Sequence, residues 1–159
     1  MAEANNNNNY SLDPKSIPWD VIRNSETIVI KFGTRALVKD NKDFDDDLFA
    51  KLGEDIKKLI DMKKKVIIVS SGAVNAGVKK LQLKSRPKEL LYQQMLAAIG
   101  NPLLMSQYQK FLPAPVGQVL VTQEDLSNRT AYVNVRNTLR LMIKEGIIPI
   151  INENDVVSI

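Results

Sequence analysis

The sequence predicts an α/β fold in which helices cover the faces of a mostly parallel sheet. Short apolar runs alternate along the chain with longer segments of helical period, and this alternation is typical of βαβ units. The run 66–69, VIIV, is apolar at every position, which is typical of a strand buried on both faces. With 159 residues, 44% of them hydrophobic, the chain is long enough to form one domain with a core.

Four segments are predicted to be strands because each is a short run rich in β-branched and other apolar residues. They are residues 27–32, 66–69, 116–122 and 147–151. Proline lacks the backbone N–H of a sheet ladder, so Pro149 is expected at a strand end or on an edge strand.

The helices are predicted from the spacing of apolar residues and from proline and glycine signals at their ends. They are expected over residues 45–65, 72–81, 85–98, 102–111 and 128–144. In the first of them, Leu48, Leu52 and Ile56 share one face. Aspartates lie at its amino end and lysines at its carboxyl end, as the helix dipole favours.

The composition excludes several kinds of chemistry. The sequence has no cysteine and no histidine, so it offers no disulfide, no thiol nucleophile and no histidine base or ligand. The net charge of +4 comes with lysines that are dispersed or lie at helix ends, which argues against nucleic acid as a partner. No apolar run reaches the ~20 residues that span a bilayer. Residues 1–26 are expected to form a disordered, asparagine-rich tail and a lead-in, and the expected location is cytoplasmic.

The first predicted strand ends in Lys31, and Gly33 and Thr34 follow it. A lysine beside a glycine turn with free backbone donors can hold a phosphate group. A surface lysine before a turn glycine gives the same pattern. The spacing also differs from that of a P-loop.

The second predicted strand ends in Ser70-Ser71-Gly72-Ala73. The two hydroxyls, the glycine and the free N–H groups of the following helix form a site suited to a carboxylate or a phosphate. Serine capping of a helix gives the same pattern without any ligand.

The fourth predicted strand ends in Asn152-Glu153-Asn154-Asp155. These side chains can bind an amine or a metal ion, although Asn and Asp also form ordinary turns. Because consecutive strands tend to be neighbours, the three strand ends are expected to meet along one edge of the sheet. Together they favour phosphoryl transfer to a carboxylate of an amino acid. A side-chain carboxylate with a pKa of about 4.3 is already ionised, so the reaction needs no histidine base.

Four motifs in residues 27–159 resemble, in their order, those of the amino acid kinase family and within it the glutamate 5-kinases. The motifs are VIKFGT, VIIVSSGAVNAG, VGQVLVTQEDL with NVRNTLR, and IIPIINENDVV. The resemblance implies a three-layer αβα sandwich, of which this chain is the amino-terminal, substrate-binding part. It implies ATP-dependent phosphorylation of the glutamate side chain to γ-glutamyl phosphate, the first step of proline biosynthesis. L-Glutamate and ATP with Mg²⁺ are then the expected ligands, and the complete enzyme is expected to be a homo-oligomer.

The resemblance also implies roles for residues in these motifs. Lys31 stabilises the transferred phosphoryl group and, with Gly33 and Thr34, contacts the phosphates of ATP. The residues expected to bind glutamate are Ser71, Gly72, Ala73, Asn152 and Asp155. Related kinases of other substrates usually have two glycines where this chain has Ser71 and Gly72, which favours glutamate. No metal ligand is predicted.

Two positions depart from the family's usual pattern. Arg35 stands where many members have a small residue, and Asn101 follows Gly100 where glutamine is usual. The family's nucleotide-binding half is expected beyond residue 159, so these 159 residues alone are expected to be inactive. The alternative function is a truncated, non-catalytic small-molecule-binding or regulatory module that keeps the pocket of Ser71 and Asp155.

Overall fold

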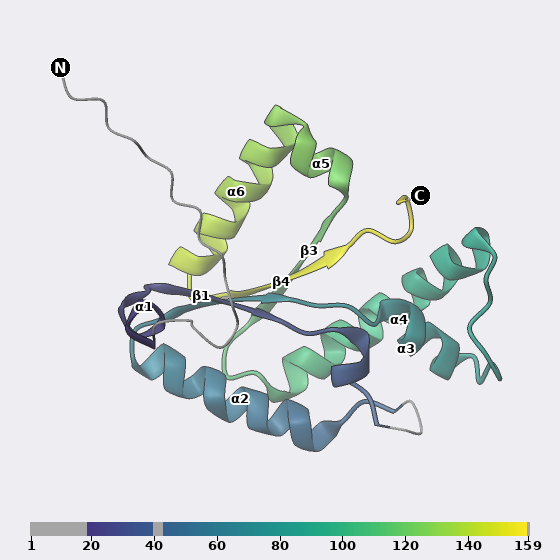
Figure 1. Cartoon of the computed structure of the whole chain (residues 1–159), viewed down its shortest axis with the longest axis horizontal. Helices are drawn as coiled ribbons and strands as arrows, with labels where there is room; N and C mark the ends of the chain where they lie inside the picture. The colour runs from purple at the N-terminus through teal and green to yellow at the C-terminus, as the bar shows by residue number, and fades with distance from the viewer. Residues whose placement is uncertain (1–18, 40–42, 159) are drawn as a thin grey trace.

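Four parallel strands form one sheet in the computed structural model, which describes residues 19–39 and 43–158 (Figure 1). The strands are β1 (Thr27–Lys31), β2 (Lys65–Val69), β3 (Val116–Val121) and β4 (Ile148–Glu153). Their order in the sheet is β1-β2-β4-β3, and every neighbouring pair is parallel. The predicted parallel sheet is therefore confirmed.

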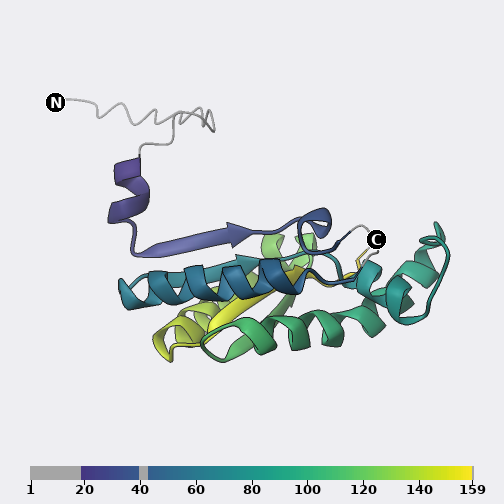
Figure 2. The ribbon, with the colours of Figure 1, turned by 90° about the horizontal axis from the view of Figure 1, so that it is seen from below.

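Helices on both faces of the sheet make three layers. Helices α2 (Asp46–Asp61) and α4 (Leu90–Phe111) lie on one face, and α6 (Arg129–Lys144) lies on the other (Figures 1 and 2). This arrangement confirms the three-layer αβα sandwich. Three shorter elements follow the carboxyl ends of strands. They are the 3₁₀ turn η1 (Thr34–Ala36) after β1, α3 (Ala73–Lys80) after β2 and α5 (Gln123–Ser127) after β3.

The core lies between the sheet and helices α2 and α4. Ile68 and Ile150 of adjacent strands are fully buried there with Phe49 of α2 and Leu104 of α4. The opposite face is less well covered, since α6 has no buried residue and Val29 of β1 is 59% exposed. In β2, Val66 and Ile68 are buried, but Ile67 and Val69 on the other face are only partly buried. The prediction that this strand is buried on both faces is therefore wrong for one face, because α6 packs mainly against β4.

One continuous helix, α4, replaces the two helices predicted on either side of residues 99–101. Pro102 lies inside it. Pro102 is exposed, whereas Leu96 and Leu104 continue a single buried face past the proline. Packing of this face outweighs the cost of about 3 kcal/mol that a proline imposes inside a helix.

A short helix that was not predicted, α5, follows β3. Thr122 Oγ1 accepts a hydrogen bond from the N–H of Asp125, and the Asp125 carboxylate accepts one from the N–H of Thr122 at 2.8 Å. This reciprocal cap starts the helix. Asn128 then starts α6 by accepting hydrogen bonds from the N–H groups of Thr130 and Ala131, both at 3.0 Å. The predicted start of that helix at residue 128 is confirmed.

Pro149 lies in β4, an interior strand of the sheet, so the edge position expected as one alternative is wrong. It is the second residue of the strand, as the other alternative expects. The N–H of Ile148 donates to the carbonyl oxygen of Pro115, on the β3 side, at 2.9 Å. The direction of the backbone groups alternates along a strand, so the nitrogen of the next residue, Pro149, faces β2. The ladder with β2 begins only at Ile150, opposite Ile68, and Pro149 therefore interrupts no ladder bond.

The lead-in to the sheet contains a helix that was not expected, α1 (Trp19–Asn24). The rest of the expected tail, residues 1–18, lies outside the described residues. In the part of the chain that the structure describes, no helix is both long enough and apolar enough to cross a membrane.

Candidate functional site

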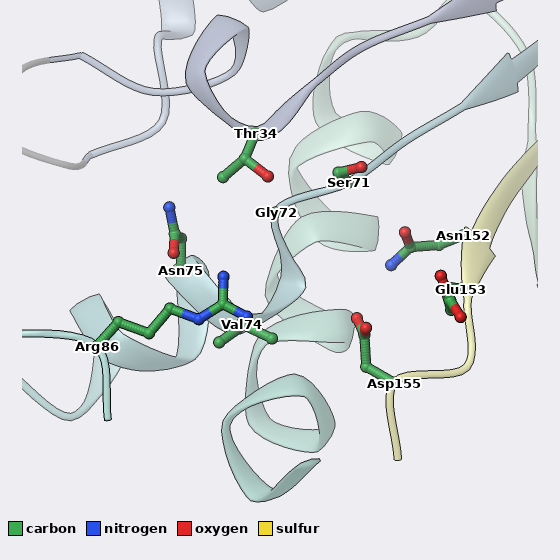
Figure 3. A pocket seen from close by; sticks show the side chains of 9 residues that line it. All are labelled: Thr34, Ser71, Gly72, Val74, Asn75, Arg86, Asn152, Glu153 and Asp155. Carbon is green, nitrogen blue, oxygen red and sulfur yellow. The ribbon is translucent and has the colours of Figure 1, made fainter. Parts of the chain in front are cut away.

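A pocket lies where the carboxyl ends of β1, β2 and β4 meet (Figure 3). Strand β2 is the neighbour of both β1 and β4, so these three ends are adjacent, as predicted. The pocket has a volume of about 190 Å³, below the roughly 300–1,000 Å³ of sites for drug-sized ligands. Its lining comes from the loops after these strands, from α3 and from the loop after α3. The lining residues are Thr34, Ser71, Gly72, Val74, Asn75, Arg86, Asn152, Glu153 and Asp155.

The two serines after β2 have different environments. Ser71 lines the pocket, whereas Ser70 is only 4% exposed. The hydroxyl oxygens of Ser70 and Tyr108 are 2.9 Å apart, which ties the end of β2 to α4. Burial raises the pKa of Tyr108 to about 12, so this hydroxyl stays protonated at neutral pH. The expectation that both serine hydroxyls form the anion site is therefore wrong for Ser70.

Gly72 precedes α3 in a left-handed backbone conformation that favours glycine. Its φ is 112°, and it offers the helix no side-chain cap. The first turn of α3 therefore presents backbone N–H groups that Gly72 cannot cap, and Val74 and Asn75 of this turn line the pocket. Such a helix start favours an anion. Ala73 is buried and adds no side chain to the lining, so any role of Ala73 in binding falls to its N–H group.

Helix α3 packs against α4 at a distance that requires glycine. A Cβ atom added to Gly77 would collide with the carbonyl oxygen of Leu96, and one added to Gly100 would collide with that of Ala73. This close packing fixes the first turn of α3, and with it Gly72, relative to the core helix α4.

Asn152 of β4 is held at the pocket wall by the buried amide group of Asn101. It is 4% exposed, and its Nδ2 donates to Oδ1 of Asn101 at 3.2 Å. Gln118 of β3 donates to the same oxygen at 3.0 Å. Asn101, which departs from the usual pattern, therefore orients Asn152 from helix α4.

Two carboxylates, Glu153 and Asp155, line the pocket after β4. Burial raises the pKa of Asp155, the charge of Glu153 raises it further, and the charge of Arg86 opposes the shift. A cation such as an ammonium group would stabilise the ionised form of Asp155.

Asn154 lies outside this pocket. It lines a second hollow beside β3, and its carbonyl accepts a hydrogen bond from the N–H of Ser158 at 2.9 Å.

The predicted phosphate loop reaches the same edge of the sheet. Thr34 lines the pocket beside Gly72. Lys31 lies at the end of β1 opposite Val69, but it is exposed and is not a lining residue. A Cβ atom added to Gly33 would meet nothing within 4 Å, so this loop faces open space. The structure thus brings Thr34 into the pocket and leaves Lys31 and Gly33 beside it.

Two polar residues of the lining, Asn75 and Arg86, were not predicted as site residues from the sequence. Asn75 lies in the first turn of α3, so the predicted helix start at residue 72 was a signal that could have identified it. Arg86 comes from the loop between α3 and α4, and no local pattern shows that this loop returns toward β4. Among residues 19–39 and 43–158, no group of three or more His, Cys, Asp or Glu side chains could hold a metal ion.

The chain is similar in sequence to known kinases over most of its length. The sequence model of the amino acid kinase family matches residues 26–159. The glutamate 5-kinase of Thermus thermophilus is 43% identical in an alignment of 137 residues that covers 84% of this chain and 37% of that protein. The glutamate 5-kinase of Alkaliphilus oremlandii is 40% identical in an alignment of 143 residues that covers 88% of this chain and 54% of that protein. The chain therefore spans only part of the length of these curated relatives.

Among solved structures, the UMP kinase of Bacillus anthracis aligns with a TM-score of 0.47 at 14% identity, covering 79% of this chain and 52% of that chain.

Proposed function

This chain belongs to the amino acid kinase family, and we propose that it forms the glutamate-binding part of a glutamate 5-kinase. The proposed reaction is the ATP-dependent phosphorylation of the glutamate side-chain carboxylate to γ-glutamyl phosphate, a cytoplasmic step of proline biosynthesis. The names of the relatives from Thermus and Alkaliphilus support this substrate.

The observation that carries the proposal is the meeting of three different strand ends at one pocket. The end of β2 offers the hydroxyl of Ser71 and the amino end of α3, which suit an anionic group. The end of β4 offers the carboxylate of Asp155, which suits an ammonium group. An amino acid with a second carboxylate carries both kinds of group.

The phosphoryl site is proposed beside this pocket, at the end of β1. Lys31 and the open loop at Gly33 lie next to Thr34, which lines the pocket. A lysine and backbone donors at this place suit the phosphate oxygens of ATP. Mg-ATP, when bound, supplies the phosphoryl group.

The residues of this chain then have two tasks, positioning and charge stabilisation. Ser71 and the first turn of α3 hold the acceptor carboxylate near the end of β1, and Lys31 stabilises the charge of the transferred group. No side chain has to remove a proton, because the glutamate carboxylate is already ionised at neutral pH. A chain without histidine is therefore adequate for this chemistry.

The test uses the full polypeptide that the gene encodes, incubated with Mg-ATP, hydroxylamine and one amino-acid acceptor. We expect γ-glutamyl hydroxamate with L-glutamate and at most traces of hydroxamate with L-aspartate or N-acetyl-L-glutamate. An equal rate with L-aspartate would contradict the proposed substrate. Glutamate binding without any product would instead identify a non-catalytic binding or regulatory module.

A further inference from the structure

Arg86 is the one cationic side chain in the lining of the pocket, as far as the described residues extend. Two carboxylates, Glu153 and Asp155, share that lining. Figure 3 shows the guanidinium group of Arg86 directed into the pocket, with the carboxylate of Asp155 across from it. A cation and an anion thus face each other on either side of a small cavity.

The loop that carries Arg86 is tied to helix α4. A guanidinium N–H of Arg86 donates to Oε1 of Gln93 in the first turn of α4. The Nε2 of Gln93 donates in turn to the carbonyl of Lys88 at 3.1 Å. Pro87 also restricts the backbone of the residue before it. These constraints hold the guanidinium group near the pocket.

Arg86 is not neutralised by the carboxylates that it faces. Its charge acts on Asp155, but no ion pair joins Arg86 to Glu153 or Asp155 in the described part of the chain. A guanidinium group has five N–H donors, and the bond to Gln93 uses one of them. The remaining donors are available to a ligand.

The surrounding charges select the kind of anion that Arg86 can bind. A guanidinium group binds a carboxylate or a phosphate through two parallel hydrogen bonds. Glu153 and Asp155 repel a doubly charged phosphate in this pocket, whereas an α-carboxylate brings an ammonium group on the same carbon. The ammonium group matches Asp155 and offsets this repulsion.

We propose that Arg86 binds the α-carboxylate of the amino-acid substrate while Asp155 binds its α-ammonium group. This inference rests on the proposed function and adds the orientation of the substrate. With its head group held between Arg86 and Asp155, glutamate extends its side-chain carboxylate toward Ser71 and Thr34. That direction leads to the end of β1, where the phosphoryl site is proposed.

The test compares the full polypeptide with its Arg86→Gln variant, using two ligands that differ only in the α-carboxylate. L-Glutamate has this group, and 4-aminobutyrate lacks it. In Arg86→Gln the KM for glutamate rises roughly tenfold to hundredfold, as expected for the loss of a charged hydrogen-bond partner. The inhibition constant of 4-aminobutyrate and the KM for ATP change less than about twofold, because neither ligand contacts the guanidinium group. Arg86→Lys recovers part of the glutamate affinity.

The matched control is Lys84→Gln, which removes an exposed cation from the same loop but outside the pocket. It leaves all three constants unchanged. An unchanged KM for glutamate in Arg86→Gln overturns the inference, and so does an equal loss for glutamate and 4-aminobutyrate, which would indicate a general disturbance of the loop. If the wild type neither phosphorylates nor binds glutamate, the proposed function is wrong, and this inference is wrong with it. If it binds glutamate without phosphorylating it, the proposed reaction is wrong, and the dissociation constants of glutamate and 4-aminobutyrate for the wild type and Arg86→Gln decide this inference.

Discussion

The side-chain amide of Asn152 donates a hydrogen bond to Oδ1 of Asn101 at 3.2 Å, which links the end of β4 to helix α4. Both residues are at most 5% exposed. Asn152 is also a lining residue of the pocket. The core of the protein therefore sets the direction of one polar group of the site.

Replacing Asn101 by alanine should weaken both the fold and the site. The amides of Asn152 and Gln118 lose their common acceptor, and a buried donor without a partner costs about 1–3 kcal/mol. We expect a lower free energy of unfolding in urea and a higher KM for glutamate. The control Asn134→Ala changes an exposed asparagine of α6 and should alter neither value appreciably. Normal stability of Asn101→Ala would show that the amide contacts contribute little.

Tyr108 should make the protein sensitive to high pH. Its pKa is about 12 in the folded protein against an ordinary value of 10.0. The folded state therefore favours the neutral phenol, so this stabilisation is complete below about pH 10 and is lost as the pH rises toward 12. The shift corresponds to roughly 2–3 kcal/mol.

Urea unfolding at several pH values between 8 and 12 tests this expectation, with pH 10 and 12 as the two limits given by the pKa values. Tyr108→Phe should lose less stability over that range than the wild type, whereas Tyr132→Phe, which changes an exposed tyrosine, should behave like the wild type. Identical pH profiles for the wild type and Tyr108→Phe would contradict a raised pKa.

Asp155→Asn should stabilise the fold while it weakens glutamate binding. A raised pKa means that the folded state disfavours the ionised carboxyl. This cost to the free energy of folding is absent at pH values below the ordinary pKa of 3.8 and present at pH values above the raised pKa. At neutral pH the neutral asparagine removes the cost, so the melting temperature should rise. The KM for glutamate should rise as well, because the substrate loses its ammonium partner.

The pH dependence gives a second readout of Asp155. In the wild type the KM for glutamate should increase as the pH falls through the raised pKa, and this increase should be smaller in Asp155→Asn, where only the carboxylates of the substrate itself are protonated. Glu145→Gln, an exposed control at the end of α6, should match the wild type. A variant with lower stability and normal KM would assign Asp155 to the turn alone.

Gly33 and Gly72 should respond differently to alanine. A Cβ atom at Gly33 has open space, so Gly33→Ala should change the free energy of unfolding by no more than about 0.5 kcal/mol. It should nevertheless raise the KM for ATP, because the methyl group enters the proposed phosphate loop. Gly72→Ala places a side chain at a φ of 112° and should cost roughly 1–2 kcal/mol. Unchanged ATP kinetics in Gly33→Ala would leave Gly33 as a turn residue only.

Local patterns were sufficient to predict the sheet and the edge at which the pocket lies. Each predicted strand, such as 66–69, is a short apolar run, and polar residues such as Ser71 and Asp155 follow directly. In a parallel sheet these ends must lie on one edge. Because β2 lies between β1 and β4, Thr34, Ser71 and Asp155 line one pocket, while Lys31 and Gly33 lie beside it.

The features that escaped prediction depend on contacts between distant segments. Pro102 signals a helix end locally, but burial of Leu104 and Tyr108 keeps α4 continuous. Asn101 gains its role only because Asn152, 51 positions away, reaches the same place. Arg86 lines the pocket only because its loop returns toward β4. Residue types and spacing along the chain contain none of this information.

The central claim is that Lys31 at the end of β1 supports phosphoryl transfer, whereas Ser71 at the end of β2 binds glutamate. The most direct test is steady-state kinetics of Lys31→Ala and Ser71→Ala in the full polypeptide, with glutamate and ATP varied in turn. Lys31→Ala should lower kcat by roughly 10²–10³ and leave the KM for glutamate nearly unchanged. Ser71→Ala should raise the KM for glutamate about tenfold, more than that for ATP. A near-normal kcat in Lys31→Ala, or equal effects of Ser71→Ala on both substrates, would contradict the claim.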